Sequence, residues 1–241
     1  MMLADILASL FPTGHDVTVT DDLITGKGTL RGGGSIHVLG IAGEKDLGVD
    51  AAVLLAGRVL QIVKAGDGVP ILVLIDSSSQ RMSRRDELLG LSEYLAHLAK
   101  SLLLAEAQGH RTIGLLYGGS AAGAFIATAL ATGTLVALPG AHPAVMDLPS
   151  MARVTKLSID VLKAKAEATP VFAPGLENLA QTGAIHAVWD ADRSLAEQLL
   201  ALLAEPPEHD TRDRLGADRG GRLKAVAIAQ RVVALASASR A

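Results

Sequence analysis

Short apolar runs alternate with amphipathic stretches through the first half of the chain. Three of these runs are rich in β-branched residues and end at small or polar residues, and they lie at 35–41, 71–75 and 112–117. Runs of this length predict buried strands. Apolar positions at helical spacing follow them, over 48–64, 83–108 and 124–130. Consecutive strand–helix–strand units predict an α/β fold with a mostly parallel sheet and helices flanking it.

Weaker patterns surround this region. The first residues predict a helix over 5–11, a strand near 17–20 and a glycine-rich turn over 26–34. Beyond it, the pattern predicts strands at 134–138 and 187–189, helices at 149–154, 176–181, 195–203 and 223–238, and a proline-punctuated loop over 169–175. We therefore divide the chain into a leading segment with a helix (1–34), a core (35–204) and a C-terminal segment (205–241) that packs on the core or on a partner.

Charges of both signs crowd the start of the C-terminal segment, between Asp210 and Arg222. Such a run is typical of a solvated surface or of a salt-bridged element at a subunit contact. The overall net charge of −3 and the pI of about 6.2 argue against nucleic acid as a partner.

Composition narrows the chemistry further. With 49 % hydrophobic but only 2 % aromatic residues, the core must be built from Ala, Val, Leu and Ile. The absence of cysteine excludes thiol catalysis and disulfides, and seven scattered histidines without an H-E-x-x-H motif predict no metal site. No apolar run approaches the roughly 20 residues of a membrane span, and the N-terminus lacks a basic signal-peptide region. We expect a cytoplasmic protein without membrane contact.

Two loops at strand ends carry the strongest chemical signal. Asp76–Gln80 follows the second strand, and Gly118–Gly123 follows the third and opens a helix. Backbone N–H groups at such loops and helix starts can hold a developing oxyanion, and small residues allow a ligand to approach them closely. The same small residues also suit helix–sheet packing, and the spacing alone does not separate these two interpretations. Neither a G-x-S-x-G elbow nor a well-placed G-x-G-x-x-G dinucleotide motif is present.

The sequences of these two loops resemble those of the carboxyltransferase branch of the crotonase superfamily. Ile75-Asp76-Ser77-Ser78-Ser79-Gln80 resembles its I-D-T-P-G-A loop, and Gly118-Gly119-Ser120-Ala121-Ala122-Gly123-Ala124-Phe125 resembles its G-E-G-G-S-G-G-A-L loop. Further stretches look like the gamma subunit of biotin-independent malonate decarboxylase, and they lie at 84–90, 123–127, 151–156, 170–175 and 212–222. The resemblance spans about Gly34 to Arg222.

This resemblance implies a crotonase-like (ClpP/crotonase) spiral of ββα units in a hetero-oligomer. It implies a beta subunit that shares the active site and an acyl carrier (delta) subunit whose dephospho-CoA-derived arm carries malonate as a thioester. The chain itself would bind no cofactor. Decarboxylation would give the acetyl thioester and CO₂ through an enolate. The alternatives are a carboxyltransferase subunit of a biotin-dependent acyl-CoA carboxylase and a non-catalytic crotonase-like scaffold.

The resemblance also implies which residues form the site. The N–H groups near Ser78, Ser79, Ala122 and Gly123 would form a catalytic oxyanion hole, and the expected substrate-binding residues are Ser77, Gln80, Gly118, Gly119, Ser120 and Ala121. The chain departs from the family pattern at two of these places. Ser78-Ser79 replaces Pro-Gly and Ala121-Ala122 replaces Ser-Gly, so either the loop conformation differs here or the catalytic hole lies elsewhere.

Overall fold

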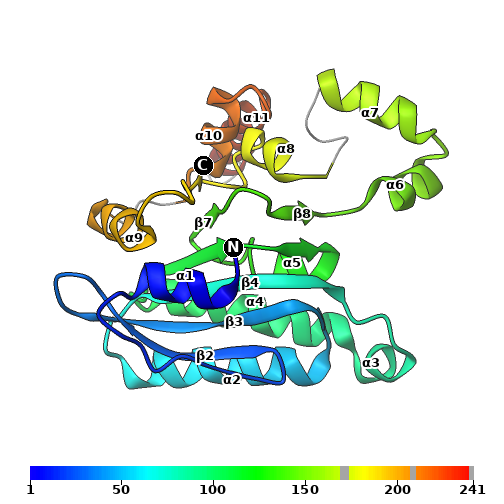
Figure 1. Cartoon of the computed structure of the whole chain (residues 1–241). Helices are drawn as coiled ribbons and strands as arrows, with labels where there is room; N and C mark the ends of the chain where they lie inside the picture. Colours follow the sequence, from blue (N-terminus) through cyan, green and yellow to red (C-terminus); the bar gives the residue numbers. More distant parts are fainter. Residues whose placement is uncertain (169–173, 207–209, 239–241) are drawn as a thin grey trace.

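A seven-stranded sheet forms the centre of the computed structural model, which describes residues 1–168, 174–206 and 210–238 (Figure 1). Its strands, in spatial order, are β1 (Thr18–Thr20), β2 (Leu23–Thr29), β3 (Ser35–Leu47), β4 (Ile71–Gln80), β5 (Thr112–Leu116), β7 (Thr134–Ala137) and β9 (Ala187–Val188). The pairs β1–β2 and β2–β3 are antiparallel, whereas every pair from β3 to β9 is parallel. A second, two-stranded parallel sheet joins β6 (Gly119–Ala121) to β8 (His142–Ala144).

Helices cover both faces of the large sheet, and alternation along β4 explains the two cores. Ile71, Val73 and Ile75 face one cluster, which contains α2 (Val49–Ala65) and α4 (Leu91–Ala107). Leu72 and Leu74 face the other, which contains α1 (Leu3–Leu10) and α9 (Leu195–Ala204). Because β4 is buried on both faces, it reads in the sequence as a continuous apolar run.

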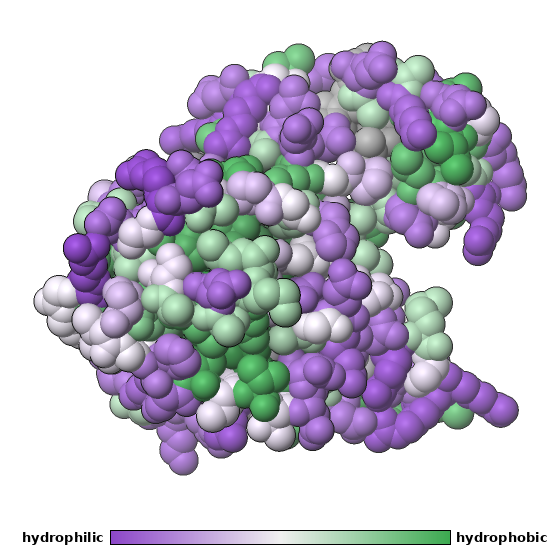
Figure 2. Space-filling model, in the orientation of Figure 1, coloured by the Kyte–Doolittle hydropathy of each residue, from purple (hydrophilic) through white to green (hydrophobic). Residues whose placement is uncertain are grey.

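Five further helices stand above the sheet in Figure 1. They are α6 (Leu148–Thr155), α7 (Ile159–Ala168), α8 (Leu176–Gln181), α10 (Arg212–Asp218) and α11 (Ala225–Ala238). Figure 2, in the same orientation, shows the surface hollowed between the part that carries α6 and α7 and the body that carries α3 (Arg84–Leu89). Helix α5 (Ala122–Ala127) lies on the same side of the molecule as this hollow.

The predicted mostly parallel sheet with flanking helices is confirmed, but several local predictions were wrong, among them a glycine-rich turn and a long helix. The glycine-rich stretch 26–34 is a turn only from Leu30 onward, since β2 runs through Thr29. Glycine is needed at position 28 of this strand because the Phe11 ring occupies the space that a Cβ would need, with the nearest ring atom 2.3 Å from the Cβ position. The predicted single helix over 83–108 is divided at Gly90, whose φ of 84° ends α3 and precedes α4.

The sequence pattern also missed α7, whose alternation of Lys and Ala gave no clear apolar face. Of the proline-punctuated loop predicted at 169–175, residues 169–173 lie outside the described part of the chain. Among the described helices, none combines the length and apolar character needed to cross a membrane.

The two terminal segments both contact the central sheet and its connections. Residues 1–34 contribute β2, which pairs with β3 from Leu23↔Ile41 to Thr29↔Ser35. In the charged C-terminal run, Arg219 donates hydrogen bonds to the carbonyl oxygens of Ala180, Ile185 and His186. This part of the run is therefore an ordered element of the chain itself. The division into three segments stays a prediction.

Candidate functional site

The Asp76 carboxylate links β4 to β3 and to β6. It accepts hydrogen bonds from the backbone N–H of Gly43 and of Gly119, each at 3.1 Å. A Cβ on Gly118 would lie 2.1 Å from Oδ1 of Asp76, so any larger residue here would displace the Asp76 carboxylate. The stretch 76–80, predicted to be a loop, is the extended end of β4, because it continues to pair with β3 at Lys45↔Ser77 and Leu47↔Gln80.

The two predicted site segments meet through a pair of buried serines. Ser77 and Ser120 are 0 % and 1 % exposed, and their Oγ atoms lie 2.9 Å apart. A Cβ on Gly119 would lie 2.9 Å from the carbonyl oxygen of Ser77, so the backbones are also in close contact. The hydroxyl groups of both serines therefore join β4 to β6, and neither of these two predicted substrate-binding residues is open to a ligand in this structure.

Gly123 already has a hydrogen-bond acceptor within the chain. Its N–H donates to Oε1 of Gln80 at 2.8 Å, so a side chain from one predicted segment occupies a predicted donor of the other. The Gln80 amide nitrogen lies 3.8 Å from Sδ of the exposed Met82. Gln80 and Gly123 are thus brought together as the sequence predicted, with the carboxamide oxygen where an oxyanion would sit.

Ser78 and Ser79 are placed differently from each other. Ser78 is exposed, whereas Ser79 is half-buried and donates its hydroxyl to the carbonyl of Gln80 at 3.0 Å. Successive N–H groups along an extended strand point to opposite edges, so only one of the two can turn toward Gly123. Ser79 also has no left-handed φ, which agrees with the loss of the glycine found at this place in the family pattern.

Ala122 carries backbone strain at the start of α5. Its φ is 49°, which lies in the left-handed region that an alanine adopts only at a cost of about 1–2 kcal/mol. The family pattern has glycine here, which is the residue that adopts this φ without strain. Strain of this kind persists only where the surroundings fix the conformation, which here include the cap that Gln80 makes on Gly123.

We expect Ala122→Gly to raise the free energy of unfolding by about 1 kcal/mol, because glycine adopts this φ without strain. Urea unfolding followed by circular dichroism measures the change. Ala96→Gly, a helical position in α4, is the matched control and is expected to lose about 1 kcal/mol. A loss of stability in both variants would contradict a strained Ala122.

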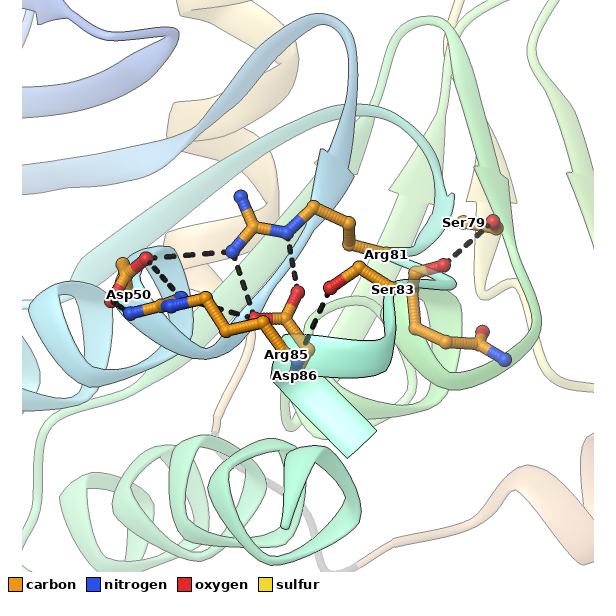
Figure 3. A network of polar contacts seen from close by, with 7 residues as sticks. Asp50, Ser79, Arg81, Ser83, Arg85 and Asp86 are labelled. Atoms are coloured by element: carbon orange, nitrogen blue, oxygen red, sulfur yellow. Dashed lines mark hydrogen bonds and ion pairs between the residues drawn. The ribbon is translucent and has the colours of Figure 1, made fainter. Parts of the chain in front are cut away.

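An ion-pair network holds the chain just after Gln80 (Figure 3). The Asp86 side chain is fully buried and accepts hydrogen bonds from Arg81 and Arg85. Arg85 also binds Asp50 of α2 through both terminal nitrogens, at 2.8 and 3.0 Å. Gly48 leaves the space that the Arg81 guanidinium fills, since a Cβ there would lie 2.5 Å from it. This network fixes the end of β4, and therefore Ser79 and Gln80, against α2 and α3.

Acid should release this network. Hydrogen bonds from Arg81 lower the pKa of Asp86 from its ordinary 3.8 to about 2, with Ser83 and Arg85 contributing. Because the folded pKa lies below the unfolded one, the stabilisation is complete above about pH 4 and is lost as the pH falls toward about 2. We expect the free energy of unfolding of the wild type to fall more steeply over this window than that of Asp86→Asn, measured by urea unfolding at each pH. Parallel slopes would contradict the assignment.

Sequence reasoning missed the residues that position this site. Asp76 was named only as part of a motif, although it is the one charged residue that directly continues the apolar run of β4. Arg81 and Asp86 were not connected to each other, because their pairing depends on the turn between β4 and α3. The signal that could have found them is the combination of an Arg and an Asp at (i, i+5) around the N-cap Ser83.

Comparison with known proteins places this arrangement in a class. Transcarboxylase 12S has a similar fold, with a TM-score of 0.67 at 17 % identity over 85 % of this chain and 41 % of that one. The Pseudomonas malonate decarboxylase MdcD-MdcE hetero-dimer contains a chain with a TM-score of 0.71 at 23 % identity, over 94 % of this chain and 96 % of that one. The fold is that of the crotonase-like carboxyltransferases.

The sequence comparison identifies the family within this class. The family model described as malonate decarboxylase gamma subunit matches residues 42–236, and the chain belongs to that family. It is also similar to the malonyl-S-ACP:biotin-protein carboxyltransferase MADD of Malonomonas rubra, with 28 % identity over 170 residues. That match covers 64 % of this chain, which spans 58 % of the length of the curated relative.

Proposed function

We propose that this chain is a subunit of a malonate decarboxylase, active only with a beta subunit. The complex converts a malonyl thioester on an acyl carrier (delta) subunit, attached through a dephospho-CoA-derived arm, to the acetyl thioester and CO₂. The chain binds no cofactor of its own and works in the cytoplasm. Family membership supports this proposal, and the meeting of the two strand tips carries its chemistry.

The reaction places specific demands on these tips. As the C–C bond to the carboxylate breaks, its electron pair moves into the thioester, and the carbonyl oxygen becomes an enolate oxygen. Preorganised N–H donors stabilise that charge more in the transition state than in the substrate. In our proposal the Gly123 N–H is such a donor, joined by Ala122 and by one of Ser78 and Ser79. The substrate oxygen replaces Oε1 of Gln80, whose half-buried side chain turns aside.

An exposed apolar surface on the isolated chain supports the proposal that a partner binds it. Helix α11 has no buried residue, although it carries almost only apolar side chains. Ile228, Val232 and Val233 are 59, 60 and 65 % exposed. A helix that is apolar on all sides is normally covered, and contiguous exposed apolar surface marks an interaction site. We propose that the beta subunit covers α11, consistent with the hetero-dimer named for the Pseudomonas relative.

A second candidate function is transfer of the carboxyl group to biotin. The name of the Malonomonas rubra relative, a malonyl-S-ACP:biotin-protein carboxyltransferase, favours this candidate. Both reactions begin by breaking the same C–C bond with the same enolate stabilisation, and they differ in where the carboxyl group goes. The residues at the two strand tips serve either outcome.

Reconstitution separates the two. The chain is combined with its beta subunit and with malonyl-loaded carrier, and both acetyl thioester and CO₂ are quantified with and without avidin. We expect stoichiometric products and no effect of avidin. A requirement for a biotinylated protein, or inhibition by avidin, would establish the carboxyltransferase instead.

A further inference from the structure

His142 lies beside the junction of the two strand tips. It is the first residue of β8 and pairs with Gly119 of β6, and its backbone N–H donates to the carbonyl of Gly118 at 3.1 Å. Its Nε2 comes so close to Gly119 that a Cβ on that glycine would lie 2.8 Å from it. The side chain therefore contacts the junction at Gly119, and because it is 62 % exposed it is also open to solvent.

Two acceptors orient the imidazole ring. Nδ1 lies 3.4 Å from the carbonyl oxygen of Gly140, and Nε2 lies 3.6 Å from Oε1 of Glu44 in β3. Glu44 itself has a left-handed φ of 51°, and the pairing of β3 with β4 is irregular at this point. An Nδ1–H directed at Gly140 leaves Nε2 as the atom that holds and gives up a proton.

Most of the other described histidines are placed away from this junction. His37 pairs with Ile71, at the opposite end of β4, and its Nε2 binds Asp67. His110 is fully buried and its Nδ1 faces the carbonyl of Val69, near that same end. His97 projects from α4 and is exposed. Within the described residues, His142 is the titratable side chain that contacts both an acidic partner and the backbone of a predicted site segment.

We propose that His142 is the proton donor that converts the enolate to the acetyl thioester, an inference that rests on the proposed function. Loss of CO₂ leaves an electron pair shared between the α-carbon and the thioester oxygen. The α-carbon forms a C–H bond with the proton that leaves Nε2 of His142, and the oxygen returns to a carbonyl as the N–H bond breaks. Water then returns a proton to Nε2, so the cycle consumes one proton per CO₂ released.

Imidazole rescue of His142→Ala tests this inference in the assembled complex. Removing a general acid costs typically about 10²–10⁴-fold in rate, and we expect a loss of acetyl thioester formation in this range. Because the site is exposed to solvent, free imidazole can enter the space that is left and restore turnover in a concentration-dependent way. His97→Ala is the matched control and is expected to keep the wild-type rate with no response to imidazole.

The outcomes separate this inference from the proposed function. Full activity of His142→Ala, or a loss that imidazole does not reverse in a complex that still assembles by size-exclusion chromatography, would overturn the role of His142. Either result leaves malonate decarboxylation by the wild-type complex intact. Absence of decarboxylation by the wild-type complex would instead overturn the proposed function.

Discussion

Without its beta subunit, the chain is expected to release CO₂ from malonyl-loaded carrier at least about 10³-fold more slowly than the assembled complex. Loss of even one oxyanion-hole donor costs about 10²–10³ in rate, and the isolated chain lacks the half of the cleft that we assign to the partner. Its own Gly123 donor is also occupied by Gln80. The measurement is CO₂ release by each subunit alone and by the mixture, at equal carrier concentration.

Two charged substitutions on α11 provide a control for the role of the beta subunit in this prediction. In Ile228→Glu/Val232→Glu the two carboxylates lie on one face of the helix, since the positions are four residues apart. Burial of unpaired charge is costly, so we expect the double variant to lose association with the beta subunit and turnover together. Leu54→Glu on α2, at a residue 59 % exposed, is expected to keep both. Full activity of the chain alone would contradict the shared site, and intact association of the double variant would exclude α11 as the docking surface.

The central part of the fold was predictable because its signals are local. Strands β4 and β5 are buried on both faces, so apolar runs found them, and α2 and α4 have one buried stripe each. The errors occurred where tertiary contacts override local pattern. Gly28 belongs to a strand because it pairs with Ile36 of β3, and Phe11 packs over it where a side chain would be. The polar residues 76–80 stay extended because β3 also pairs with them. Neither contact can be read from residues close in sequence.

The candidate site was predictable in part for the same reason. The sequence placed two small-residue segments at the ends of neighbouring parallel strands, and the structure brings them together through Ser77 and Ser120. It could not show that Gln80 caps Gly123 or that Ala122 keeps a left-handed φ, because both depend on atomic positions across the junction. The use of this oxyanion hole in catalysis stays a prediction, and substitution at Gly123 tests it.

Gly123→Val is expected to reduce turnover of the assembled complex by at least about 10²-fold, which corresponds to losing one oxyanion-hole donor. A Cβ at this position would lie 2.9 Å from Cδ1 of Leu95 and 3.2 Å from Oε1 of Gln80. The β-branched side chain therefore fills the space beside the Gly123 N–H, where both Gln80 and the substrate oxygen would bind. Turnover is measured in the reconstituted complex, and circular dichroism verifies that the helix content is unchanged.

A matched glycine separates this effect from a general cost of valine. Gly57 of α2 has no heavy atom within 4 Å of its Cβ position, so Gly57→Val introduces the same side chain into open space and is expected to keep the wild-type rate. The turnover of Gly123→Ala, which adds only the Cβ, is expected to lie between that of the wild type and that of Gly123→Val. If Gly123→Val folds, assembles and turns over normally, the N–H groups of this segment do not stabilise the enolate. The cap by Gln80 would then be purely structural, and the chain would serve its partner as a scaffold.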